Sequence, residues 1–120
     1  MCYFLFHRKS MTALEKDPKK YIEERFRWLQ ERGYHLRYSF RNGEHDFWYD
    51  KSLTEIYLYY DDLDTVACRI GSGSPRHDRS IFAFLDDAAR DRYDHLPPEG
   101  KIDFLSEKLE DILGSLDGEA

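Results

Sequence analysis

The stretch YHLRYSFRNGEHDFWY, residues 34–49, decides the fold. Large apolar residues alternate with polar ones on both sides of Asn42-Gly43, the pair that favours the two positive-φ positions of a type I′ turn. A two-residue turn at this point places Arg41 opposite Glu44 and so fixes the pairing of every residue further out. The stretch therefore predicts a β-hairpin of known register.

The same alternation continues in residues 54–60 and 65–70, which indicates two more strands and a four-stranded antiparallel meander. One face of this sheet is expected to be apolar and to form the core. Its residues include Leu36, Tyr38, Phe40, Phe47, Tyr49, Ile56, Leu58, Tyr60, Val66, Cys68 and Ile70. The opposite face is expected to carry Arg37, Asp46, Trp48, Glu55, Tyr57, Tyr59 and Arg69.

Helices are predicted before and after the sheet. Asp17-Pro18 is a good helix start and Gly33 a good stop, so a helix is expected over residues 18–32. Ser80 is expected to cap a second helix that ends before Pro97-Pro98, and an amphipathic third helix follows Gly100. Residues 71–79 are expected to form a polar loop.

The predicted fold class is α+β: a helix, a four-stranded antiparallel meander sheet, then two helices, with the helices mainly on one sheet face. A chain of 120 residues has room for a single domain, residues 1–120. Residues 1–16 remain open between an edge strand, a docked arm and a frayed terminus.

Composition indicates a cytoplasmic protein with no membrane span. Charged residues make up 35% of the chain, and the apolar run Cys2–Phe6 is too short to cross a bilayer. Cys2 and Cys68 form no disulfide framework or zinc-ligand pattern, and Cys68 is expected in the core. The formal charge of -6 disfavours nucleic acid and favours a basic protein as partner.

The second sheet face is the candidate binding surface, because Trp, Tyr and Arg are the residues most enriched in interface hot spots. The partner-binding candidates are Arg37, Trp48, Tyr57, Tyr59 and Arg69. The alternative is that Tyr3–Phe6 or the middle helix covers this face and makes it a second core layer.

No residue pattern specifies a reaction, so no catalytic residue, cofactor or metal site is predicted. Asp61, Asp62 and Asp64 fit a solvated turn better than a cation site. Two further functions stay open. One is a ligand-binding or enzymatic pocket between sheet and helices, lined by Tyr38, His45, Tyr49 and Tyr60. The other is a homo-oligomerising module that pairs its sheet faces or edges.

Three segments carry a resemblance: Glu31-Arg32-Gly33-Tyr34, the Tyr-rich run 56–61, and Leu96-Pro97-Pro98 before the closing helix. Together they resemble small uncharacterised bacterial α+β proteins, some of which are similar to immunity proteins of toxin systems. The resemblance covers about residues 18–113 and implies a stoichiometric inhibitor that covers the active site of a basic toxin or enzyme.

Overall fold

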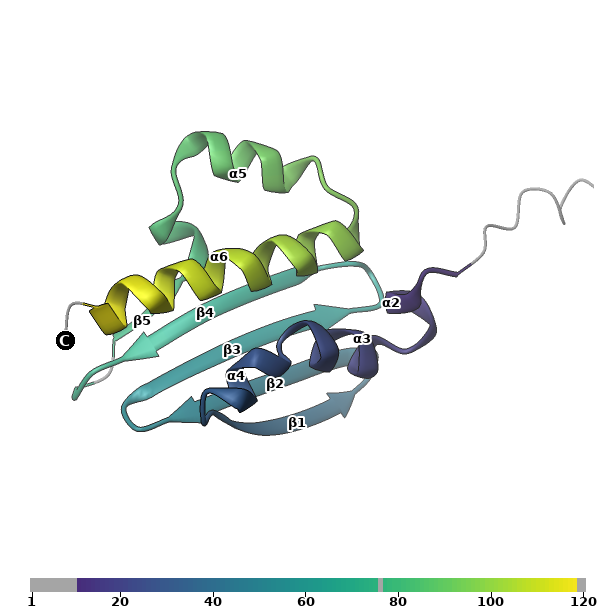
Figure 1. The fold of residues 1–120 in the computed structure, drawn as a ribbon. Coiled ribbons are helices and arrows are strands. Elements are labelled where there is room, and N and C mark those ends of the chain that lie inside the picture. Colours follow the sequence, from purple (N-terminus) through teal and green to yellow (C-terminus); the bar gives the residue numbers. More distant parts are fainter. Residues whose placement is uncertain (1–10, 76, 119–120) are drawn as a thin grey trace, which may run out of the picture.

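The computed structural model of the chain describes residues 11–75 and 77–118. The described part has an α+β fold, in which helices cover one face of a five-stranded antiparallel sheet (Figure 1). The strands lie side by side in chain order: β1 (His35–Arg41), β2 (Glu44–Lys51), β3 (Thr54–Asp61), β4 (Val66–Ser72) and β5 (His77–Ser80). The expectations for Cys2 and for Tyr3–Phe6 concern residues outside the described ranges.

The first hairpin confirms the predicted register. Asn42 and Gly43 have φ angles of 53° and 80°, and Arg41 pairs with Glu44. Every later pair of the two strands follows from that turn, including Arg37 with Trp48. The local turn chemistry thus determines which side chains of β1 and β2 share a face of the sheet.

The prediction of four strands was wrong, because the segment expected to be a polar loop contains a fifth strand. β4 continues past Ile70 to Ser72, and the chain then returns so that Ser72 pairs with His77 and Arg69 with Ser80. All four side chains of β5 are exposed. A strand of this kind has no apolar alternation that a sequence pattern could reveal, since it is held by backbone pairing.

A short helix precedes the predicted first helix. It is α2 (Ala13–Lys16), and it begins with a capping box in which Thr12 Oγ1 accepts from the Glu15 amide at 3.1 Å. The Glu15 carboxylate in turn accepts from the Thr12 amide at 2.9 Å. These reciprocal bonds satisfy two amides that a helix start leaves without partners.

The helix expected over residues 18–32 begins as predicted but is broken in two. Asp17 caps α3 (Pro18–Arg25), and α4 (Arg27–Glu31) follows after Phe26. At the break the Leu29 amide donates to the Phe26 carbonyl, so the Arg25 carbonyl accepts from Ser106 Oγ at 2.7 Å instead. A side chain about eighty residues away therefore satisfies the carbonyl that the break releases.

The region after the sheet also divides further than expected. Ser80 caps only the 3-10 turn η1 (Ile81–Phe84), and Asp86 caps α5 (Asp87–Asp94) through the Ala89 amide at 2.8 Å. The last helix, α6 (Pro98–Gly118), begins at Pro98 rather than after Gly100. Within residues 11–75 and 77–118, no helix has both the length and the apolar character needed to cross a membrane.

The core lies between the sheet and the helices, on the predicted face. Cys68 is buried there, as expected. The largest fully buried side chains come from the sheet (Phe47, Tyr49, Ile56), from the N-terminal helices (Leu14, Ile22, Phe26, Leu29), from η1 (Ile81) and from α6 (Ile102, Leu105, Leu109). Apolar burial of this extent dominates the stability of the fold.

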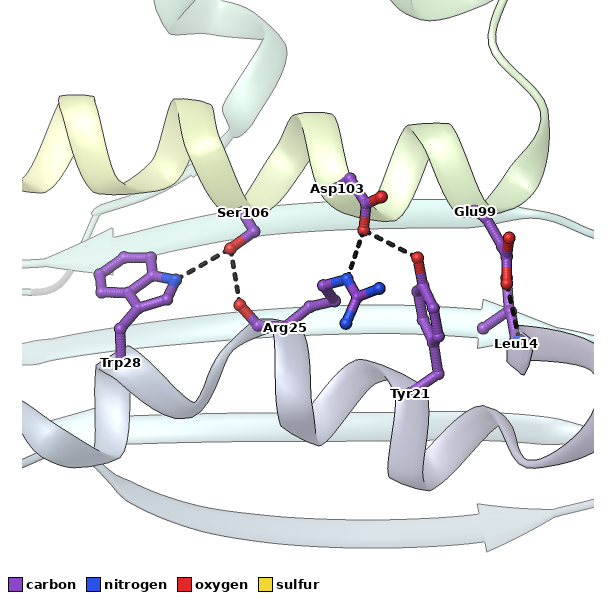
Figure 2. Close-up of polar contacts among 7 residues, drawn as sticks. All are labelled: Leu14, Tyr21, Arg25, Trp28, Glu99, Asp103 and Ser106. Atoms are coloured by element: carbon purple, nitrogen blue, oxygen red, sulfur yellow. Dashed lines mark hydrogen bonds and ion pairs between the residues drawn. The ribbon is translucent and has the colours of Figure 1, made fainter. Parts of the chain in front are cut away.

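A polar seam joins α6 to the N-terminal helices (Figure 2). Asp103 accepts from the Tyr21 hydroxyl at 2.9 Å and from Arg25 Nε at 2.8 Å. Ser106 Oγ accepts from Trp28 Nε1 at 2.9 Å while it donates to the Arg25 carbonyl. Two further bonds extend the seam: the Leu14 amide donates to Glu99 at 3.0 Å, and Arg32 donates to Glu110 at 2.8 Å. The seam thus links α6 to α3 and α4 along one side of the apolar core.

Gly43 provides a test of the turn that sets the register. Gly43→Ala should destabilise the protein, because the residue has a positive φ and an added Cβ would lie 2.6 Å from an Asp62 oxygen. Gly114→Ala is the matched control, since nothing lies within 4 Å of that site on α6. We expect the control to raise the free energy of unfolding by up to about 1 kcal/mol. Urea unfolding of both variants measures this, and equal effects would contradict the turn geometry.

Candidate functional site

The candidate site is the sheet face opposite the helices, here called the open face. Its centre is a straight row of four side chains, one from each of β1 to β4: Arg37, Trp48, Tyr57 and Arg69. We call these four residues the open-face row. Each member lies directly opposite the next in the strand register, and the turn at Asn42-Gly43 sets the first of these pairs, Arg37 with Trp48.

Within the open-face row, cations cover both ends of an aromatic pair. The Trp48 and Tyr57 ring centroids lie 5.7 Å apart. The Arg37 guanidinium lies 5.2 Å from the Trp48 ring centroid, and that of Arg69 lies 5.3 Å from the Tyr57 centroid. Neighbouring side chains hold the two rings in place while leaving them partly exposed. Rings held in this way lose little conformational freedom when they contact a partner.

Carboxylates surround the row. Arg37 contacts Asp50 at 3.1 Å and Glu55 at 3.2 Å. The Tyr57 hydroxyl donates to Asp46, and Glu44 and Asp61 lie at the turn end of the same face. Arg41 lies at that end as well, opposite Glu44. The carboxylates Asp46, Asp50 and Glu55 outnumber the guanidinium groups of Arg37 and Arg69 around the aromatic pair.

Tyr59, the fifth predicted site residue, lies one row away from the other four. It is opposite Asp46 on β2 and Ala67 on β4. Its hydroxyl donates to Asp61 at 2.7 Å and to Glu44 at 3.2 Å. Tyr59 therefore extends the aromatic surface toward the turn end of the sheet.

Among the described residues, the helices leave the open face uncovered (Figure 1). The middle helix, α5, packs on α6, where Tyr93 and Phe104 have ring centroids 5.7 Å apart. It therefore does not cover the open face, which was one of the two alternatives. The other alternative, cover by Tyr3–Phe6, lies outside the described residues.

The four side chains that the sequence suggested as the lining of a pocket lie partly in the core and partly at the turn end of the sheet. Tyr49 is fully buried in the core, and Tyr38 lies beside His45 with its hydroxyl 2.7 Å from Nδ1. His45 and Tyr60 line a recess of about 330 Å³ together with residues of α2, α3 and two turns. Sequence reasoning missed this recess because Glu15 and Asp64, two of its walls, are far apart in the chain.

Burial raises the pKa of several tyrosine hydroxyls. Burial and the hydrogen bond to Asp46 raise the pKa of Tyr57 well above its usual value. Burial and the hydrogen bond to Asp103 raise the pKa of Tyr21 to about 12, and burial raises that of Tyr93 to about 12. These hydroxyls therefore stay neutral in the folded protein at pH values where an unfolded chain ionises them.

The tyrosine shifts predict a loss of stability at high pH. An unfolded tyrosine ionises near pH 10, so the stabilising contribution is complete below about pH 10 and is lost as the pH rises through about 12. The absorbance of tyrosinate in the native protein should therefore rise later than in urea-unfolded protein. Coincident titration curves would contradict the burial and hydrogen bonding described above.

Comparison of the chain with protein-family models, with curated proteins and with solved structures finds no match. The functional argument therefore rests on the residues of the open face and their geometry.

Proposed function

We propose that the chain is a non-catalytic protein-binding domain that docks a basic protein on its open face. The observation that carries the proposal is the open-face row, an Arg–Trp–Tyr–Arg series across four strands on the face opposite the described helices. Trp, Tyr and Arg dominate the binding energy of protein interfaces when they cluster at the centre of a patch. The row lies at the centre of the open face.

Charge supports a basic partner. The whole chain has a formal charge of -6, and carboxylates outnumber arginines around the aromatic pair. An acidic rim accelerates the encounter with a basic protein and disfavours acidic ones. The aromatic pair would then supply most of the binding energy after encounter.

The resemblance to immunity proteins belongs to the same proposal. A domain with a broad aromatic face and an acidic rim is suited to cover the active site of a basic toxin or enzyme at one-to-one stoichiometry. In this role the domain needs no reactive group of its own. Inhibition of the recovered partner by wild-type protein is the activity that this part of the proposal predicts.

The test is affinity capture from the lysate of the native host, with wild type beside a Trp48→Ala, Tyr57→Ala double variant. Leu63→Ala is the matched control, because Leu63 is apolar, 83% exposed and in the β3–β4 turn. The recovered protein is identified, purified and titrated against all three chains. We expect a basic protein that binds wild type and the control alike, and the double variant at least about thirtyfold more weakly.

Three outcomes would overturn the proposal. The first is equal binding by the folded double variant and wild type, which would place the contact elsewhere. The second is an acidic partner. The third is self-association through the same face, seen as a molecular size that rises with concentration in wild type and not in the double variant.

A further inference from the structure

The recess of about 330 Å³ lies at the turn end of the sheet, on the helix side, away from the open face. It is called the end recess here. Its walls are Glu15, Pro18, Phe40, Gly43, His45, Tyr60, Asp62 and Asp64. The described helices do not cover the last row of the helix-side face, where Phe40 remains 57% exposed, and the recess lies there.

That last row is aromatic across three strands. Phe40 lies opposite His45, and His45 lies opposite Tyr60. Their ring centroids are 4.6 Å and 6.0 Å apart, respectively. Aromatic rings gathered at a cavity attract a cation through their negatively polarised faces and also accept the apolar stem that carries it.

Three of the other wall residues are negatively charged. Glu15 accepts from the Thr12 amide and Asp64 accepts from the Tyr60 hydroxyl at 3.0 Å. Because both donors are neutral, these bonds orient the carboxylates without cancelling their charge. Asp62 adds a third carboxylate beside Gly43.

An adjoining recess of about 340 Å³ extends the negative surface. It shares Glu15 and Asp64 with the end recess and adds Glu99, with Met11, Pro97 and Pro98 as apolar walls. Within residues 11–75 and 77–118, no lysine or arginine lines either recess. Burial lowers the pKa of His45, so its ring also adds no positive charge at neutral pH.

We propose that the end recess binds an organic cation, namely an ammonium or guanidinium group on an apolar stem. A wall that combines aromatic rings with carboxylates matches both parts of such a group. A bare metal ion fits less well, since the described residues contain no cluster of three or more His, Cys, Asp or Glu arranged to hold one. A lysine or arginine side chain and a free amine share this chemistry. The proposal is independent of the open face.

The test is an NMR titration of the full ¹⁵N-labelled chain with three probes. Nα-acetyl-lysine-methylamide represents a polypeptide side chain, and butylammonium represents a free amine. Nα-acetyl-norleucine-methylamide is the neutral counterpart of the first, with the same four-carbon stem and no ammonium group. We expect saturable shifts of the Gly43 and His45 amides with the cations and none with the neutral probe. Tighter binding of the lysine probe would indicate a polypeptide source, and tighter binding of butylammonium a free amine; either order supports the site.

Two variants test separately whether cation binding depends on the charge of the recess wall or on its aromatic shape. Asp62→Asn with Asp64→Asn keeps the shape of the wall, and we expect at least about tenfold weaker cation binding. Phe40→Ala, which removes an exposed ring, should weaken binding by about twofold to fivefold. Asp111→Asn on the exposed side of α6 is the control and should bind as wild type does.

Equal shifts with the neutral probe, or unchanged affinity in both the double variant and Phe40→Ala, would overturn the proposal. Phe40→Ala keeps the test decisive if the double variant does not fold. Loss of cation binding here leaves the open-face capture unaffected, so the two proposals fail separately.

Discussion

Phe47→Ala is expected to lower the free energy of unfolding by about 3–5 kcal/mol, the usual cost of deleting a buried ring. Phe47 has no exposed surface and contacts Tyr38 at a centroid distance of 4.9 Å. Trp48→Ala, at the next residue of β2, should cost no more than about 1–2 kcal/mol. Trp48 is partly exposed and contacts Arg37 and Tyr57 on the open face, so less packing is lost with it than with Phe47.

Urea unfolding followed by far-ultraviolet circular dichroism measures both variants without relying on tryptophan fluorescence. Similar slopes of free energy against urea would show that the two denatured states are comparable. Losses of equal size at Phe47 and Trp48 would mean that both faces of the sheet are packed, which would contradict the open face.

The second large effect concerns α6. Leu105→Ala should cost about 2–5 kcal/mol, because Leu105 is fully buried between the helix and the sheet. Asp103→Ala should cost no more than about 1 kcal/mol, although it removes two bonds of the polar seam. The Asp103 side chain is 50% exposed, so water replaces most of what is lost.

These two variants, measured in the same way, separate apolar packing from the seam as the source of stability. A larger loss at Asp103 than at Leu105 would show that the seam, and not the apolar stripe, holds α6 in place. Asp103→Asn is a useful companion, since it retains an acceptor for Tyr21 while it removes the charge that faces Arg25.

Local chemistry made the first four strands of the sheet predictable. The Asn42-Gly43 turn determines the β1–β2 register, which places Arg37 opposite Trp48, and the β2–β3 register adds Tyr57 to the same row. The candidate site could therefore be named from sequence, because membership of a sheet face depends on counting residues from a turn. The start of α3 at Asp17-Pro18 was predictable for the same reason, since a cap is a local feature.

Long-range contacts account for what the sequence did not show. The break after Arg25 depends on Ser106, and the exposed strand β5 depends on the neighbouring edge of β4. The capping box of α2, by contrast, has a readable Thr12-x-x-Glu15 spacing that could have identified this helix. The end recess required Glu15 and Asp64 to be brought together by the fold.

The most direct test of the open face uses the two tryptophans of the chain as separate probes. Trp48 lies in the open-face row, whereas Trp28 lies in the polar seam and donates to Ser106. Fluorotryptophan-labelled protein is titrated with the purified partner, and the two ¹⁹F resonances are assigned with single Trp→Phe variants. We predict that the Trp48 resonance shifts and saturates at one equivalent of partner while the Trp28 resonance stays in place. A shift of Trp28 with no change at Trp48 would contradict the account.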